Sequence, residues 1–394
     1  MLNRKELSPL ADKKGLKSLE ASLFSVFIGL LTGCLIILIV SLADDKISFK
    51  TGFDAVKLIF FGVFCQGRDS SGELIFGLGG ANAGNLLFKT TPIIMTGLSV
   101  ALAFKTGLFN IGAPGQYLMG TAATLIVALS LPEALPSALR WLIAFISAMA
   151  AGALWGSIPG LLKARFKINE VLSSIMTNWI AANAVTWIFE ESDLRNSAQS
   201  GKIGYIMPTS MKGIATSKLG LDRIFPSSQV NGGIIIALIF AILIYILLFK
   251  TTFGFENRIS GSNIHAAEYA GIRIRRKTII TMALAGALSG SGAALYYLSG
   301  DTEFFHATYQ SLPQEGFNGI PVSLLALNNP LGVIFSGLFM SSLNISGQLI
   351  KNLTTFNEFI TDIVTAVIVY LSAFSLFISQ MISSKRRRES EVKK

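Results

Sequence analysis

The chain has 394 residues, of which 51% are hydrophobic and 14% charged, and its mean hydropathy is +0.58. Soluble domains carry roughly 25% charged residues, so a water-soluble fold could not cover this much apolar surface. The formal net charge of +10 is compatible with nucleic-acid binding, but the placement of the charges along the chain, described below, excludes that class.

The apolar residues are gathered in long blocks. About 20 apolar residues span the hydrocarbon core as a helix, and the blocks lack the period-two alternation of membrane β-barrels. The sequence therefore predicts an all-α, polytopic bundle of transmembrane helices. Seven blocks of at least 19 residues contain no Asp, Glu, Lys or Arg: Ala21–Ala43, Leu108–Leu131, Trp141–Leu162, Val171–Phe189, Asn231–Phe249, Thr278–Gly300 and Ile363–Met381.

Three further spans are predicted from weaker signals. Leu86–Phe104 carries Lys89 near its outer end, where a long side chain can reach water. The uncharged stretch Gly316–Ile350 is too long for one span, and it is expected to break at Asn328-Asn329-Pro330, because proline disfavours helix at the residue before it. Two helices result, the first of them short. The amphipathic stretch Phe53–Phe64 is expected at the outer interface.

The basic residues fix the orientation. With the N-terminus in the cytoplasm, the inner segments hold 21 of the 33 Lys and Arg residues, as the positive-inside bias requires. Ten spans place both basic tails on that side, whereas nine or eleven would not. The predicted organisation is a cytoplasmic tail at 1–20, a membrane domain at 21–383 with an external loop at 191–230 and a cytoplasmic loop at 250–277, and a second tail at 384–394.

Several kinds of chemistry are excluded by missing motifs. The chain has no P-loop for nucleotide, and no HExxH or GxSxG motif. Cys34, Cys65, His265 and His306 have no metal-ligand spacing, so no metal site is predicted. No charged residue lies near the middle of an uninterrupted span, which disfavours an ion-coupled carrier. A channel or a membrane enzyme would need a continuous polar lining or a catalytic cluster, and neither is found.

Two segments combine glycine, asparagine and a helix start: Leu108–Gln116 and Gly316–Pro321. In transporters, interrupted helices recur at matching positions of two inverted halves and point toward a midplane site. The halves are predicted at about 86–190 and 278–383. The alternative is that Asn, Gly and Pro are ordinary helix-start residues. The residues predicted to line a path are Phe109, Asn110, Gln116, Ser173, Asn178, Phe317 and Asn318.

Two other patterns concern packing and docking. Glycines at four-residue spacing, Gly152/Gly156/Gly160 and Gly286/Gly290, predict close helix contacts. In the inner loop, His265–Ala270 is predicted to form a short helix closed by Gly271, of a kind suited to docking a cytoplasmic partner.

Four stretches of this chain, in this order, resemble the permeases of bacterial ABC importers for ribose-type sugars, branched-chain amino acids and nucleosides. The resemblance covers about Thr91–Ile382. The segment from Phe109 to Gln116 and the helix that opens with Asn169-Glu170-Val171 look most like the larger nucleoside permease that works with a basic-membrane-protein type lipoprotein. The chain departs from the pattern at Pro114, where an acidic residue is expected, and at Pro321, where a small one is usual. The stretches are Thr91–Leu98, Gly107–Gln116, Asn169–Asn178 and Gly261–Ile272.

This resemblance implies a multi-pass subunit of the bacterial cytoplasmic membrane that imports nucleosides by alternating access, or, as the alternative, a simple sugar of the ribose or galactose type or riboflavin. It implies a heterodimer with a second homologous permease, ATP-binding subunits that hold ATP and Mg²⁺, and an external substrate-binding lipoprotein; this chain itself would bind no cofactor. The resemblance also implies that the short helix predicted at His265–Ala270 is the coupling helix, which contacts the ATPase. Its implied contacts to the ATPase are Ser260, Asn263, His265, Ala266, Ala267, Tyr269 and Gly271.

Overall fold

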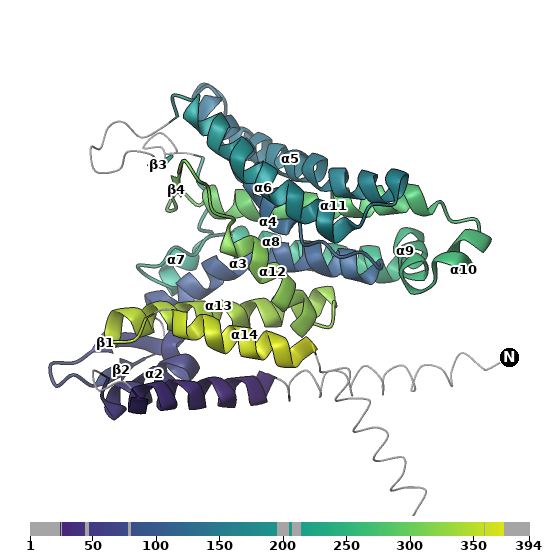
Figure 1. Ribbon diagram of the computed structural model, residues 1–394. Helices are drawn as coiled ribbons and strands as arrows, with labels where there is room; N and C mark the ends of the chain where they lie inside the picture. Colours follow the sequence, from purple (N-terminus) through teal and green to yellow (C-terminus); the bar gives the residue numbers. More distant parts are fainter. Residues whose placement is uncertain are drawn as a thin grey trace, which may run out of the picture. The chain divides into compact units, whose positions relative to one another are not determined.

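The computed structural model describes residue 24 and residues 26–43, 47–77, 80–194, 205–206, 214–357 and 359–373. The predicted tails 1–20 and 384–394 lie outside these residues, as does much of the loop 191–230. The chain divides into a larger compact unit, Gly79–Ser341, and a smaller one made of Met1–Leu78 and Ser342–Lys394. Each is described separately (Figure 1).

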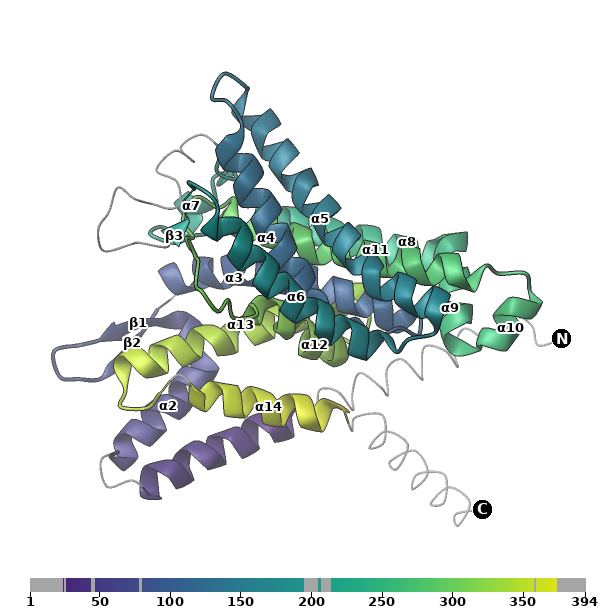
Figure 2. The same cartoon turned by 45° about the horizontal axis from the view of Figure 1, so that its top comes forward.

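The larger unit is a helical bundle (Figure 2). Within this unit the short strands β3 (Tyr205–Ile206) and β4 (Phe304–Phe305) pair antiparallel. Its helices are α3 (Ala81–Lys105), α4 (Ala113–Ser130), α5 (Ser137–Phe166), α6 (Glu170–Glu190), α7 (Leu221–Ile224), α8 (Gly233–Lys250), α9 (Thr252–Ser262), α10 (Ile264–Tyr269), α11 (Ile274–Tyr297), α12 (Gln314–Leu325) and the first part of α13 (Pro330–Leu353).

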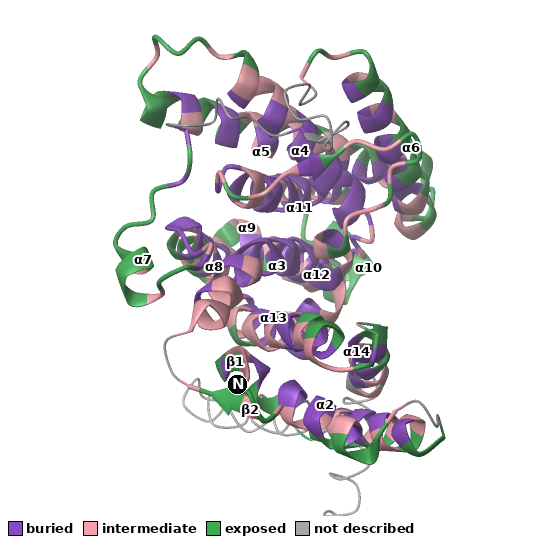
Figure 3. Cartoon of the chain, turned by 90° about the vertical axis from the view of Figure 1, so that its left-hand side faces the viewer, coloured by how far each residue is buried: buried purple, intermediate pink, exposed green. Residues whose placement is uncertain are grey.

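Helix α11 lies at the centre of the larger unit, packed against α3, α4 and α5, and α3 and α11 are mainly buried in Figure 3. The predicted glycine contacts are confirmed. A Cβ added at Gly152 or at Gly286 would fall on the other residue's carbonyl oxygen, and one at Gly120 would lie 2.5 Å from the Cα of Gly290. Glycine therefore allows α4, α5 and α11 to approach backbone to backbone.

The outer helices present large apolar side chains, as a bilayer requires. Exposed examples are Leu154 on α5, Trp187 on α6 and Leu243 on α8. Within the described residues, six helices are long and apolar enough to cross a membrane: Val26–Ala43, α3, α5, α8, α11 and α13. The prediction of a membrane protein built from helices is thus confirmed at this level.

Two predicted helix starts are corrected. The segment Leu108–Gln116 does not precede its helix entirely, because α4 begins at Ala113 with Pro114 in its first turn. Likewise α12 begins at Gln314, so Gly316–Pro321 lies inside that helix. Proline fits the first turn of α4 because its missing N–H has no helical acceptor there. The predicted break before Pro330 is confirmed: α12 is short, and Leu327 and Asn328 have positive φ before α13 begins.

The smaller unit contains the helix Val26–Ala43, α2 (Phe49–Phe61) with the 3-10 turn Gly62–Phe64, the rest of α13, and α14 (Phe359–Ala373). Strands β1 (Cys65–Arg68) and β2 (Leu74–Phe76) form a hairpin after α2. Arg68 anchors this hairpin, since it pairs with the buried carboxylate of Asp54 at 2.9 Å and donates to the Leu353 carbonyl at the end of α13. An Arg with two anionic or carbonyl partners fixes the hairpin's position on its unit.

Candidate functional site

Two side-chain amides, those of Asn110 and Gln116, bond to each other across the segment that leads from α3 into α4. Asn110 donates to the Gln116 Oε1 at 2.9 Å, and Gln116 donates back to the Asn110 Oδ1 at 3.0 Å. The Asn110 Oδ1 also accepts from the backbone N–H of Gly112. Asn110 is fully buried and Gln116 nearly so. These amides brace the entry to α4, because their polar atoms bond within the segment.

Side chains from three other helices hold the same segment. Asn110 donates to Ser99 of α3 at 3.0 Å, and Ser289 of α11 donates to the carbonyl of Ala113 at 2.7 Å. Asn178 of α6 accepts from the N–H of Gly115 and donates to the carbonyl of Ile111, both at 2.9 Å. Sequence reasoning found Asn178 but missed Ser99 and Ser289, which look like ordinary small residues in a packed bundle.

Replacing Asn110 with Leu is expected to destabilise the bundle. The change removes the bonds to Ser99 and Gln116 and leaves the buried Gln116 amide unsatisfied, at a cost of about 1–3 kcal/mol. The thermal midpoint of the purified protein in detergent should fall. The matched control is Asn183→Leu, because Asn183 is exposed on α6 and bonds only within its own helix, to Trp179. Equal midpoints for the two variants would contradict the bracing role.

The other predicted path residues have different surroundings. Phe109 is half-buried and stacks on Phe104, with ring centroids 4.9 Å apart. Ser173 is buried and donates back to carbonyls of its own helix. Phe317 is half-buried, and Asn318 is buried with its Oδ1 accepting from Gln314 at 3.4 Å. Their role in lining a path stays a prediction.

The structure brings the two Phe-Asn segments together. Gly316 lies directly against Pro114, so that a Cβ at Gly316 would overlap the Pro114 backbone. Helix α12 also packs on α3, where the Thr96 hydroxyl donates to the Glu315 carbonyl at 2.8 Å. The first turns of α4 and α12 therefore meet inside the larger unit. Helix N-termini carry partial positive charge, and two of them converge here.

This meeting point is deep in the bundle. Thr96 lies nine residues before the end of α3 at Lys105, and at 1.5 Å per residue it is about 14 Å from that end. The backbone of Glu315 therefore lies beside the interior of α3, away from both ends of that helix. The sequence predicted no charged residue near the middle of an uninterrupted span. Glu315 was not covered by that prediction, because it lies in the first turn of the short helix α12.

The loop 250–277 forms the short helix predicted there, α10 (Ile264–Tyr269). Asn263 caps α10, its side chain accepting from the N–H of Ala266 at 3.0 Å, and Gly271 follows the helix with a φ of +78°. His265, Ala266 and Tyr269 are exposed, the last at 99%. Ser260 lies buried in α9, bonded to Glu256.

Ala267 requires a correction, because it is fully buried on α10. A fully buried side chain cannot contact a docked protein. Any docking role belongs to its exposed neighbours, while Ala267 holds the helix against the bundle.

The end of α9 contacts the turn between α3 and α4. Gly107, with a φ of +72°, lies so close to Gly261 that a Cβ on Gly107 would be 2.6 Å from the Gly261 Cα. Gly261 is the penultimate residue of α9, two residues before Asn263, which caps α10. The loop that carries α10 is thus in direct backbone contact with the segment that leads to Asn110.

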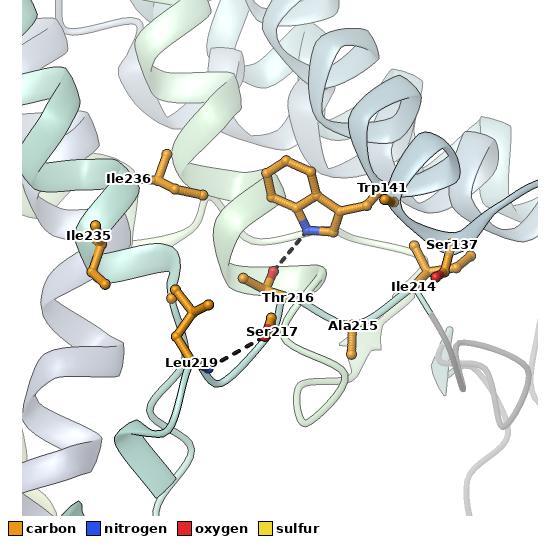
Figure 4. A pocket seen from close by; sticks show the side chains of 11 residues that line it. Ser137, Trp141, Ile214, Ala215, Thr216, Ser217, Leu219, Ile235 and Ile236 are labelled. Carbon is orange, nitrogen blue, oxygen red and sulfur yellow. Dashed lines mark hydrogen bonds between the residues drawn. The ribbon is translucent and has the colours of Figure 1, made fainter.

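A hollow of about 370 Å³ lies elsewhere, where the starts of α5 and α8 meet residues 214–219 (Figure 4). The Trp141 indole donates to Thr216 at 2.9 Å, and the Thr216 hydroxyl in turn donates to the Leu298 carbonyl. The lining is mainly apolar and includes none of the predicted path residues.

Comparison with known proteins identifies the family of this chain. A family model described as the permease component of a branched-chain amino acid transport system matches residues 82–373. The chain belongs to this family. By family, therefore, this chain is a permease component of a transport system.

Individual transport proteins are also similar to this chain. The permease is 32% identical over 375 residues to the guanosine ABC transporter permease protein NupP of Bacillus subtilis, covering 95% of this chain and 99% of that one. It is 35% identical over 322 residues to the nucleoside ABC transporter permease protein NupB of Lactococcus lactis, covering 81% and 87%. A glucose ABC transporter permease protein of Haloferax volcanii is 29% identical over 298 residues, covering 74% and 76%.

Proposed function

We propose that this chain is a membrane permease subunit of an ABC importer that carries nucleosides into a bacterial cell. The observation that supports this most is the similarity to the guanosine permease NupP along almost the whole of both chains. The glucose permease favours the sugar alternative, but it is less similar over a shorter stretch. No observation favours riboflavin.

The proposed topology has ten spans in two inverted halves, with both basic tails in the cytoplasm. Each predicted span overlaps a helix in the described part of the chain, and six of these helices are long and apolar enough to cross a membrane. The contact between Gly316 and Pro114 supports the inverted halves, because the matching segments meet where such halves would form a path. Movement of the two halves about this contact would open the path to alternate sides.

The proposed partners follow from the same comparison. Bacillus subtilis has two guanosine ABC transporter permease proteins similar to this chain, NupP and NupQ, the latter 28% identical over 268 residues. This supports a heterodimer with a second permease. ATP-binding subunits on the inner face would hold ATP and Mg²⁺, and an external lipoprotein would deliver the nucleoside.

Reconstitution tests this function. The full complex in vesicles, supplied with the external binding protein and internal ATP, is expected to accumulate radiolabelled nucleoside. A complex without the ATP-binding subunits should accumulate none. Uptake that persists without those subunits, or uptake of glucose in place of nucleoside, would overturn the proposal.

The docking role of α10 is tested at Tyr269, the most exposed residue of that helix. Truncating an interface tyrosine costs about 2 kcal/mol when it is a hot spot, so Tyr269→Ala should weaken the binding of the ATP-binding subunits more than tenfold. Binding of the purified ATP-binding subunits to the permease in detergent measures the effect. The control is Tyr309→Ala, because Tyr309 is 90% exposed before α12 and, in the proposed topology, on the other side of the membrane. Equal binding by both variants would exclude docking through Tyr269.

A further inference from the structure

The hollow where the starts of α5 and α8 meet residues 214–219 lies outside the predicted path (Figure 4). It encloses about 370 Å³, which is within the range of ligand-binding pockets. Both helices are long and apolar enough to cross a membrane. The hollow is therefore a cavity of ligand size at one end of two membrane-spanning helices.

The segment 214–219 forms a fixed wall of this hollow. Thr216 donates to the Leu298 carbonyl twice, from its backbone N–H at 2.7 Å and from its hydroxyl at 3.1 Å. The N–H of Gly232, just before α8, donates to the Ser217 carbonyl at 2.8 Å. Because hydrogen bonds hold the segment at two points, the hollow is part of the folded structure.

Aromatic rings connect the two helices beside the hollow. Trp141 of α5 stacks on Phe145, with ring centroids 5.1 Å apart and planes at 9°, and Phe145 lies 6.3 Å from Phe240 of α8. The main helix contacts lie elsewhere, since α5 packs on α4, α6 and α11, and α8 packs on α3 and α9. The hollow is thus the space between two helices that meet through side chains.

The lining of the hollow favours an apolar ligand. The Trp141 indole N–H donates to the Thr216 hydroxyl at 2.9 Å, and the Ser217 hydroxyl accepts from the Leu219 N–H at 3.4 Å. In the described part of the chain, no charged side chain is among the lining residues. A nucleoside would bury the donors and acceptors of its base and ribose here without enough partners, which is unfavourable.

The surroundings of the hollow indicate which apolar ligand is available. Ile235 lines the hollow and is exposed, as are Ile239 and Leu243, one and two turns further along α8. The lining therefore continues into the apolar face of α8. Trp141 suits this position, because tryptophan is enriched at membrane–water interfaces. An apolar cavity that stays empty loses dispersion contacts of its walls, and in a bilayer the neighbouring apolar groups are acyl chains.

We propose that this hollow binds one acyl chain of a membrane phospholipid, which lies between the first turns of α5 and α8 and packs against residues 214–219. In the proposed topology this lipid belongs to the outer leaflet. The bound chain fills the cavity and supports its wall. The inference depends on the membrane location of this family and not on the substrate that is transported.

Photolabelling of the full-length chain in a bilayer tests this site. The vesicles contain phosphatidylethanolamine, phosphatidylglycerol and a trace of phosphatidylcholine with a diazirine midway along one acyl chain. After irradiation, mass spectrometry of the peptides should find label on residues 214–217 and on Trp141. In Ala138→Phe, where the added ring extends from the lining, this label should fall about tenfold, because a ring and an acyl chain cannot occupy the same space. Label on Leu243, which reports lipid along α8, should stay unchanged.

Ala150→Phe is the matched control, since Ala150 is exposed on α5 and does not line the hollow. It should leave the label on residues 214–217 unchanged. Absence of that label in wild type, or equal label in Ala138→Phe and Ala150→Phe, would overturn the proposal. Loss of the label on adding excess guanosine would also overturn it, because the hollow would then hold a nucleoside. Should Ala138→Phe fail to reach the membrane, Ala215→Phe gives the same comparison from the segment 214–219: loss of label supports the site, and unchanged label excludes it.

Discussion

Gly286→Leu is expected to leave no folded permease in the membrane. A Cβ at Gly286 would overlap the Gly152 carbonyl oxygen on α5. Overpacking a core costs about 1–3 kcal/mol when side chains can shift, but here the obstacle is the backbone of a neighbouring helix. Moving α11 away would also open the contact between Gly290 and Gly120 on α4. The yield of monodisperse protein after mild detergent extraction measures this loss.

Ala283→Leu is the matched control for that variant. Ala283 lies three residues before Gly286 on the same helix and is half-buried, so an added side chain there has room to turn aside. Its yield should stay near that of wild type. Equal yields for the two variants would show that α5 and α11 do not depend on this close approach.

The glycine contacts also show what the sequence can and cannot provide. Four-residue spacing places Gly152 and Gly156 on one face of their helix, and it does the same for Gly286 and Gly290, so close packing by each helix was predictable. The identity of the partner was not, because spacing specifies a face and not what covers it. That α5 and α11 pack on each other depends on the tertiary fold.

The two Phe-Asn segments were likewise predictable only in part. The repeated Phe-Asn pattern predicted two related helix entries, and the structure brings Gly316 and Pro114 into contact. The pattern could not show that the Asn110 and Gln116 side chains bond to each other, because that depends on how the chain folds back. The position of Glu315 beside the interior of α3 was not predictable, because Glu315 directly precedes an uncharged stretch and so resembles a loop residue. Only its bond to Thr96 shows that position.

Gly261→Val is expected to separate ATP hydrolysis from transport. Gly261 lies between the exposed helix α10 and the turn that leads to Asn110, and a Cβ on it would be 2.6 Å from the backbone nitrogen of Gly107. The backbone contact between Gly107 and Gly261 joins the end of α9, which leads into α10, to the segment that leads to Asn110. Coupling free energies are typically about 1–3 kcal/mol, so nucleoside uptake should fall roughly 5- to 150-fold.

Two measurements on one reconstituted complex decide this prediction: nucleoside uptake and ATP hydrolysis. The exposed face of α10 is unchanged in Gly261→Val, so the ATP-binding subunits should still bind and hydrolyse ATP, and the ATP consumed per nucleoside should rise. Ser262→Val is the control, because Ser262 is the next residue and its side chain is exposed. If nucleoside uptake and binding of the ATP-binding subunits both fall in Gly261→Val, the prediction is wrong, and the contact is needed for binding those subunits. Loss of coupling alone would leave their binding unchanged.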